Sequence, residues 1–167
     1  MVASPPRDEP RLVANVGALA LFRERVGVWL SFTGAAYYKA YASELNRRGS
    51  KPSWVTAMAI IDQHPGITQS ELGRYMAVNR ASAMALAVEM EEAGLACRTL
   101  LPGRNKTALS LTEKGRASLE EGCHIEERLS QALLKDFTTE ETKAFVRQLK
   151  LIERALQAWG DARPADA

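Results

Sequence analysis

The sequence has little cysteine and no long hydrophobic run. Its two cysteines, Cys97 and Cys123, are far apart and form no CxxC motif, which indicates neither a disulfide scaffold nor a zinc cluster. The longest uncharged run, residues 26–38, is shorter than the roughly 20 residues that span a bilayer. The polar opening MVASPPRDEPR also lacks the apolar core of a secretory signal. We therefore predict a cytoplasmic protein with no membrane partner.

Excess charge and catalytic motifs are also scarce. The 22 basic residues nearly balance the 20 acidic ones, and the net charge of +2 does not by itself indicate a polyanionic partner. His64 and His124 belong to no metal-ligand spacing. The acidic pairs at residues 91–92 and 120–121 are typical of solvated helix faces rather than of acid–base catalysis. The sequence thus predicts no metal site, no cofactor and no enzymatic activity.

Helical periodicity dominates the first half of the chain. Apolar residues make up 46% of the sequence and charged residues 25%, which is typical of one globular domain. From Leu19 to Leu45 large apolar residues recur at steps of three and four, which predicts one long amphipathic helix. Pro52 suits the first position of a second helix, which we expect to stop at His64.

Capping motifs then predict two closely spaced helices. Thr68 and Glu71 match a capping box that begins a short third helix. Asn79 caps a fourth helix, and Gly94 ends it. Periodicity assigns the fourth helix a core face with Ala83, Leu86, Ala87 and Met90, and an outward face with Ala81, Ser82, Met84, Ala85 and Val88.

The period changes to two between Ala96 and Thr112, which predicts a β-hairpin. Pro102 and Gly103 suit the centre of a type II turn, and Cys97 is assigned to an apolar strand face. Thr112 then caps a long helix. A second capping box, at Thr138 and Glu141, begins a last helix that runs to about Trp159.

This order of elements predicts a mainly α fold with a small β-hairpin wing, a winged helix-turn-helix flanked by long helices. We expect a flexible lead over residues 1–18 and a tail over residues 161–167. Residues 51–112 form the predicted DNA-binding domain, and residues 19–50 and 113–160 form the flanking helices.

Two motifs, ELGRYMAVNRASAMALAVEMEEAGLACR and ALSLTEKGRASLEE, resemble the MarR family of bacterial transcription regulators. The resemblance implies a homodimer in which the first helix and the last two helices of each subunit interlock, so that residues 19–50 and 113–160 are the expected dimerisation helices. It also implies a palindromic double-stranded DNA operator, with the fourth helix in the major groove and the hairpin reaching beyond it.

The residues expected to contact DNA lie on the third and fourth helices and at the hairpin tip: Thr68, Gln69, Asn79, Arg80, Ser82, Met84, Arg104, Asn105 and Lys106. The segment from Ala96 to Ser118 carries five basic residues against the single acid Glu113, so positive charge is concentrated at the wing. Two alternatives remain: the charged tip is only a solvated turn, or the protein is a helical interaction module that does not bind DNA.

An effector site is also expected where the first and second helices meet. The resemblance implies that this junction holds an effector. The aromatic side chains expected there favour a small aromatic compound, an aromatic acid or its CoA thioester, bound beside Phe32, Tyr37, Tyr38 and Trp54. Packing in the core is the alternative for each of these side chains. The resulting hypothesis is a repressor released by this effector, with a redox switch at Cys97 or Cys123 as the rival mechanism.

Overall fold

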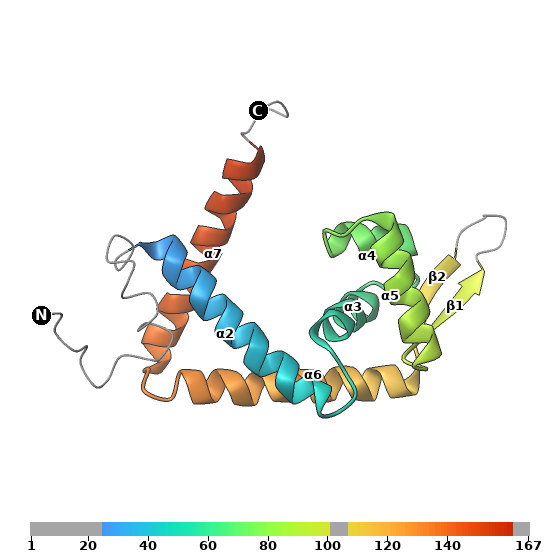
Figure 1. The fold of residues 1–167 in the computed structure, drawn as a ribbon, viewed down its shortest axis with the longest axis horizontal. Helices are drawn as coiled ribbons and strands as arrows, with labels where there is room; N and C mark the ends of the chain where they lie inside the picture. The colour runs from blue at the N-terminus through green and yellow to red at the C-terminus, as the bar shows by residue number, and fades with distance from the viewer. Residues whose placement is uncertain (1–24, 101–106, 162–167) are drawn as a thin grey trace, which may run out of the picture. The chain divides into compact units, whose positions relative to one another are not determined.

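The computed structural model describes residues 25–100 and 107–161, and Figure 1 shows them as a ribbon. The chain divides into two compact units, Met1–Ile125 and Glu126–Ala167. The predicted class, mainly α with a small β-hairpin, is confirmed. The described elements are, in order, α2 (Val26–Asn46), α3 (Pro52–Gln63), α4 (Gln69–Tyr75), α5 (Arg80–Glu92), β1 (Ala96–Leu100), β2 (Thr107–Leu111), α6 (Glu113–Leu133) and α7 (Thr139–Asp161).

The predicted caps begin α4 and α5. The Thr68 hydroxyl accepts a hydrogen bond from the Glu71 amide at 3.3 Å, and the Glu71 carboxylate accepts one from the Thr68 amide at 2.9 Å. These two bonds complete the capping box before α4. The Asn79 side-chain oxygen accepts from the Ser82 amide at 2.9 Å and so caps α5. Each cap satisfies backbone groups that the first turn of a helix leaves unpaired.

The hairpin forms as predicted, and the sequence pattern did not reveal its third extended neighbour. β1 and β2 pair antiparallel along their full length. On the other edge of β2, Thr68 forms an isolated bridge with Ala108. The Leu109 amide also donates to the Ile67 carbonyl at 2.8 Å. These bonds attach the hairpin directly to the start of α4.

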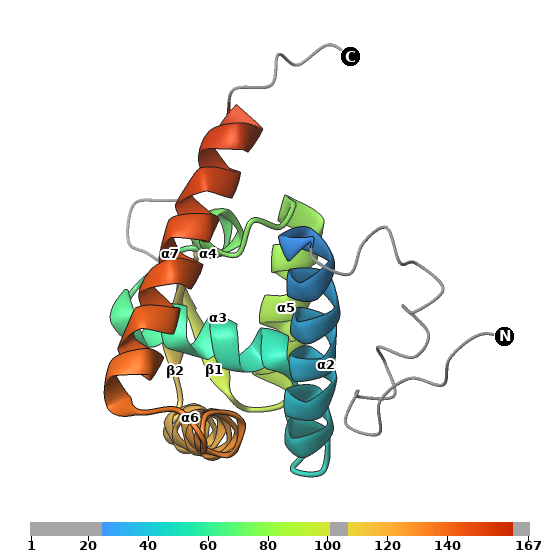
Figure 2. The same cartoon turned by 90° about the vertical axis from the view of Figure 1, so that its left-hand side faces the viewer.

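Side chains from α2, α3, α4, α5 and β2 form the core of the N-terminal unit. Burial of one such side chain contributes about 1.5–3 kcal/mol. Figure 2 shows this unit from the side, where α3 packs against β2. The face of α5 predicted to be core is buried at all four positions. The largest fully buried side chains are Leu45, Met58, Ile61, Leu72, Met90 and Leu109.

A close backbone contact places the start of α6 against the end of α5. The Thr112 hydroxyl accepts from the Gly115 amide at 3.0 Å, as predicted for a cap, and donates to the Gly94 carbonyl at 2.7 Å. Gly94 has φ of +69°, the left-handed conformation that favours glycine after a helix. A Cβ atom on Gly115 would lie 1.9 Å from the Leu95 carbonyl oxygen. The contact therefore requires glycine at position 115.

A second contact connects α6 to α2 and α3. The Tyr41 hydroxyl donates to the Gly122 carbonyl at 3.2 Å. A Cβ atom on Gly122 would lie 2.7 Å from a methyl group of Val55. Arg48 and Glu121 form an ion pair at 2.6 Å beside this contact. The first half of α6 thus packs as part of the N-terminal unit.

The C-terminal unit holds the end of α6 and all of α7. Thr138 and Glu141 form the second predicted capping box, with bonds of 2.8 and 3.2 Å. Hydrogen bonds from the Thr138 amide and hydroxyl hold the pKa of Glu141 below its ordinary value. The rings of Phe137 and Phe145 lie 6.1 Å apart. Several large apolar side chains of α7 are exposed within this chain: Phe145, Val146, Leu149, Leu151, Leu156 and Trp159.

One expectation is wrong in the structure. The sequence places Cys97 on an apolar strand face, but Cys97 is exposed, because β1 is covered only at Ala96. The first part of the predicted first helix, residues 19–24, lies outside the described residues, in which α2 begins at Val26. Among the described helices none combines the length and the apolar character needed to cross a membrane.

Candidate nucleic-acid interface

A tight turn joins α4 to α5. Ala77 has φ of +53°, a left-handed conformation that is uncommon for a residue with a side chain. The Val78 amide closes the turn by donating to the Gly73 carbonyl at 3.0 Å. A Cβ atom on Gly73 would lie 3.0 Å from the Ala83 Cβ, so the two helices cross closely where Gly73 has no side chain. The result is a compact helix-turn-helix.

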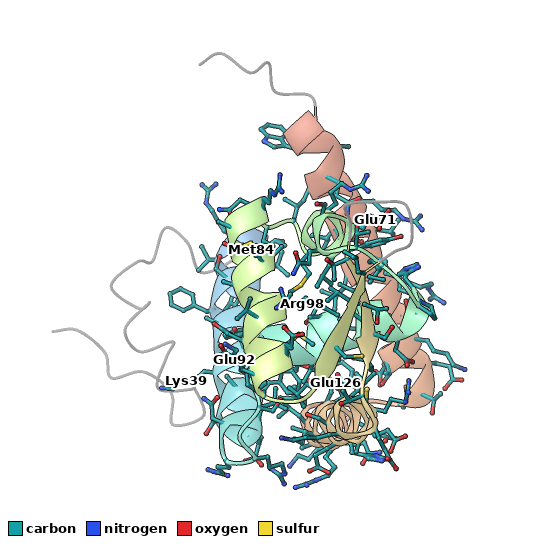
Figure 3. The ribbon with its side chains drawn as sticks, turned by 90° about the vertical axis from the view of Figure 1, so that its right-hand side faces the viewer. Lys39, Glu71, Met84, Glu92, Arg98 and Glu126 are labelled. Atoms are coloured by element: carbon teal, nitrogen blue, oxygen red, sulfur yellow. The ribbon has the colours of Figure 1, made fainter. Side chains whose placement is uncertain are left out.

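The exposed face of α5 is small and nearly uncharged. Arg80, at its N-terminus, is exposed and forms no ion pair with another described residue. Ser82 is exposed in the first turn, and Met84 is 56% exposed and projects from α5 (Figure 3). Ala81 and Ala85 complete this face. It is therefore available for contact with a partner molecule.

The α4 side of the site contains expected and unexpected residues. Thr68 and Gln69 are half-buried, and Thr68 is engaged in the capping box. The Gln69 amide nitrogen has no hydrogen-bond partner among the described residues. Exposed Arg74 and Tyr75, in the last turn of α4, were not predicted as site residues. Arg74 lies two positions after buried Leu72, on the opposite side of the helix, so its exposure was available from the sequence. Tyr75 lies three positions after Leu72, on the same side by spacing, so its exposure was not.

Asn79 has a structural role at the site. Its side-chain oxygen accepts the hydrogen bond that caps α5, so this oxygen is already engaged. The residue is exposed, and the amide nitrogen of the same side chain points to no partner among the described residues. Asn79 therefore positions Arg80 and Ser82 by fixing the start of α5.

Ion pairs engage acidic side chains toward the end of α5. Lys51 and Trp54 both donate to the Glu89 carboxylate, and these hydrogen bonds hold the pKa of Glu89 below its ordinary value. Arg98 pairs with Glu91. The charge of Arg98 was counted toward the positive wing, but this carboxylate compensates it. Free positive charge on the helix-turn-helix therefore lies nearer Arg80 than Arg98.

The wing tip lies outside the described residues. This segment includes the predicted turn at residues 102–103 and the three expected DNA contacts Arg104, Asn105 and Lys106. The structure does describe where its two strands are anchored. β2 bridges to Thr68, the cap of α4, so the hairpin is attached at the N-terminal end of that helix.

The four aromatic residues expected at an effector site have different surroundings. Phe32 and Tyr37 are half-buried on α2, where Tyr37 stacks on Tyr41 at 6.1 Å. Tyr38 is 59% exposed and lines a hollow of about 720 Å³ together with residues 39, 42–43 and 46–47. Trp54 is half-buried on α3 and bonds Glu89 of α5 at 3.3 Å. The described contacts thus connect Trp54 to α5.

The thiols and imidazoles show no built site in the described part of the chain. Cys97 and Cys123 are both exposed. His64 stacks on Tyr75 with ring centroids 4.7 Å apart. Residues 25–100 and 107–161 contain no group of three histidine, cysteine or acidic side chains that would hold a metal ion.

Comparison with known proteins identifies the same helix-turn-helix. A model of the MarR family matches residues 48–103, which contain α3, α4, α5 and β1. The crystal structure of MarR is similar, with 26% identity, a TM-score of 0.68, and coverage of 80% of this chain and 98% of that one. Among proteins of curated function, none matches this chain significantly.

Two further solved structures share the fold. A MarR family protein of Mycobacterium tuberculosis in complex with DNA has 22% identity and a TM-score of 0.66, over 76% of this chain and 96% of that one. The transcriptional repressor CouR, bound to a 23-mer DNA duplex, has 23% identity and a TM-score of 0.74, over 81% of this chain and 96% of that one. CouR has also been solved with p-coumaroyl-CoA. These matches confirm the winged-helix fold and the family resemblance that the sequence motifs indicate.

Proposed function

We propose that this chain is a transcriptional regulator of the MarR family, a dimeric repressor that binds a palindromic DNA operator and is released by a small aromatic effector. The observation that supports DNA binding most directly is the exposed N-terminal half of α5. It is presented by a tight turn, and it bears the cation Arg80, which pairs with none of the residues that the structure describes. Its other side chains are mostly small enough for close approach to base edges.

In this proposal α5 enters the major groove with its N-terminal turns foremost. Arg80 contacts a guanine edge or a phosphate, and Ser82 bonds a base or a phosphate. Thr68 and Gln69, at the start of α4, lie toward the backbone, where amide and hydroxyl groups position a protein on the duplex. Arg104, Asn105 and Lys106 extend the contact to phosphates or the minor groove. Two subunits would read half-sites about 34–36 Å apart.

Replacing Arg80 with alanine is expected to cost about 1–3 kcal/mol of binding free energy on the true operator and less on random DNA. The operator is first obtained by selection from random duplexes, and affinities are then measured by fluorescence anisotropy over a range of salt concentrations.

Lys106→Ala should instead weaken binding to all sequences and flatten the salt dependence by about one unit of slope, because one phosphate contact is lost.

Arg154→Ala is the matched control, because it removes one exposed cation from α7, outside the helix-turn-helix. Its operator affinity should equal that of the unaltered protein. If no duplex is enriched and binding to DNA shows no salt dependence, the chain is instead an interaction module that does not bind DNA. Equal losses for Arg80→Ala on operator and random DNA would assign Arg80 to a phosphate rather than to a base.

The proposed effector is an aromatic acid or its CoA thioester. Support comes from the hollow beside Tyr38, because Lys39 lines it and its cation complements a carboxylate next to an aromatic ring. Arg47 also lines the hollow, but its guanidinium is paired with Glu44. Further support comes from the aromatic residues Phe32 and Tyr37 on the same helix. The fold relative CouR binds p-coumaroyl-CoA, which is a compound of this class.

A matching effector is expected to weaken operator binding about 5- to 150-fold, the usual range for coupling between two sites. A panel of aromatic acids and their CoA thioesters is titrated into the operator complex, and the intrinsic tryptophan fluorescence of the protein reports binding in parallel. Tyr38→Ala should abolish the response without changing the affinity of the free protein for operator, whereas Tyr38→Phe should retain it. If the whole panel changes neither affinity nor fluorescence, the effector proposal fails.

A further inference from the structure

The exposed side chains of α5 are of types that recognise only some of the four DNA bases. In the major groove, adenine is read by asparagine or glutamine, cytosine by acidic groups, guanine by arginine or lysine, and the thymine methyl by apolar contact. Between Arg80 and Val88 the exposed residues are Ala81, Ser82, Met84 and Ala85, so this surface has no side-chain amide and no carboxylate.

The apolar groups lie together on the part of the helix that would face the bases. Ala81 and Ala85 follow one another at i and i+4 along the middle of the exposed face, and Met84 follows Arg80 by the same step on its flank. At the other end of this face lie two exposed carboxylates, Glu89, which is paired with Lys51, and Glu92. DNA phosphates repel the charge of Glu92. Contact is thereby confined to the first two turns, where Met84 is the largest exposed apolar side chain.

We infer that α5 recognises thymine C5-methyl groups, with Met84 as the principal specificity-determining contact and Ala81 and Ala85 lining the approach. This inference rests on the proposed DNA-binding function and names the class of sequence that is bound, a half-site whose centre is rich in thymine. Arg80 supplies the only guanine-reading group among the described residues of α5. Truncating Met84 leaves the core unchanged because its side chain is exposed rather than packed.

The test replaces each thymine of the selected half-site, one at a time, with deoxyuridine, which lacks only the C5-methyl group. Each methyl that α5 contacts should contribute about fourfold to affinity, the equivalent of one buried carbon. At the thymine that Met84 contacts, deoxyuridine should no longer lower the DNA affinity of Met84→Ala. It should still lower the affinity of Met84→Leu. This coupling identifies a direct contact, because an indirect effect on DNA shape would persist in Met84→Ala.

Two results would overturn the inference. If the protein selects an operator but deoxyuridine substitution leaves its affinity unchanged, the methyl readout is wrong while DNA binding stands. The same holds if the unaltered protein and Met84→Ala lose affinity equally at every thymine. If no operator can be selected at all, DNA binding itself fails, and the apolar face of α5 is then a surface for a protein partner.

Discussion

Replacing Gly115 with alanine is expected to lower the free energy of unfolding by about 3 kcal/mol or more. The added Cβ would lie 1.9 Å from the Leu95 carbonyl oxygen and 2.9 Å from the carbonyl carbon. That carbonyl cannot easily move, because it accepts a hydrogen bond from the Thr112 amide at 3.1 Å, while the Leu95 amide donates to Met90 at 2.8 Å. The substitution therefore has to separate α6 from the end of α5.

Urea unfolding followed by circular dichroism measures this effect, at one protein concentration for all variants because association adds to stability. Gly34→Ala is the matched control: nothing lies within 4 Å of its Cβ position in the middle of α2. The free energy of unfolding of Gly34→Ala should rise by about 0.5–1 kcal/mol, because alanine has a higher helix propensity than glycine. Gly122→Ala should fall between the two, because its close neighbours are Val55 methyl groups that can shift. Equal stability of Gly115→Ala and Gly34→Ala would contradict the close contact.

The contrast between these glycines shows which parts of the fold the sequence predicts. Capping boxes are local, because the interacting groups lie three residues apart, and both predicted boxes formed at Thr68 and at Thr138. The buried face of α5 was predictable for the same reason, since its period follows from helix geometry. The need for glycine at position 115 depends on Leu95, which approaches only when the hairpin folds. No spacing within α6 encodes that contact.

The candidate site divides in the same way. Exposure of Arg80, Ser82 and Met84 follows from their helical phase. The pairing of Arg98 with Glu91 depends on how β1 lies against α5, so a count of charges along the chain could not show that a carboxylate compensates Arg98. Trp54 was grouped with the aromatic residues of α2 by proximity of the predicted helices. The structure engages its indole with Glu89, a partner 35 residues away.

Replacing Leu156 with glutamate is expected to weaken the proposed dimer at least about 100-fold. Apolar side chains Phe145, Leu149, Leu156 and Trp159 recur along one face of α7, and Leu156 is 63% exposed within a single chain. Burying Leu156 against a partner helix would stabilise the dimer by about 1.5–3 kcal/mol. A glutamate at this position would lose that contribution and add the cost of removing a carboxylate from water. Sedimentation equilibrium measures the dissociation constant.

Ala158→Glu is the matched control, because it places the same new charge two residues away on the opposite side of α7. It should leave the dimer intact and operator binding unchanged. In Leu156→Glu the affinity for a full palindrome should fall toward that for a single half-site, because the second half-site contributes only while the two subunits are joined. Half-site affinity itself should not change, since Leu156 lies outside the helix-turn-helix. A Leu156→Glu protein that remains a dimer would place the interface away from this face of α7.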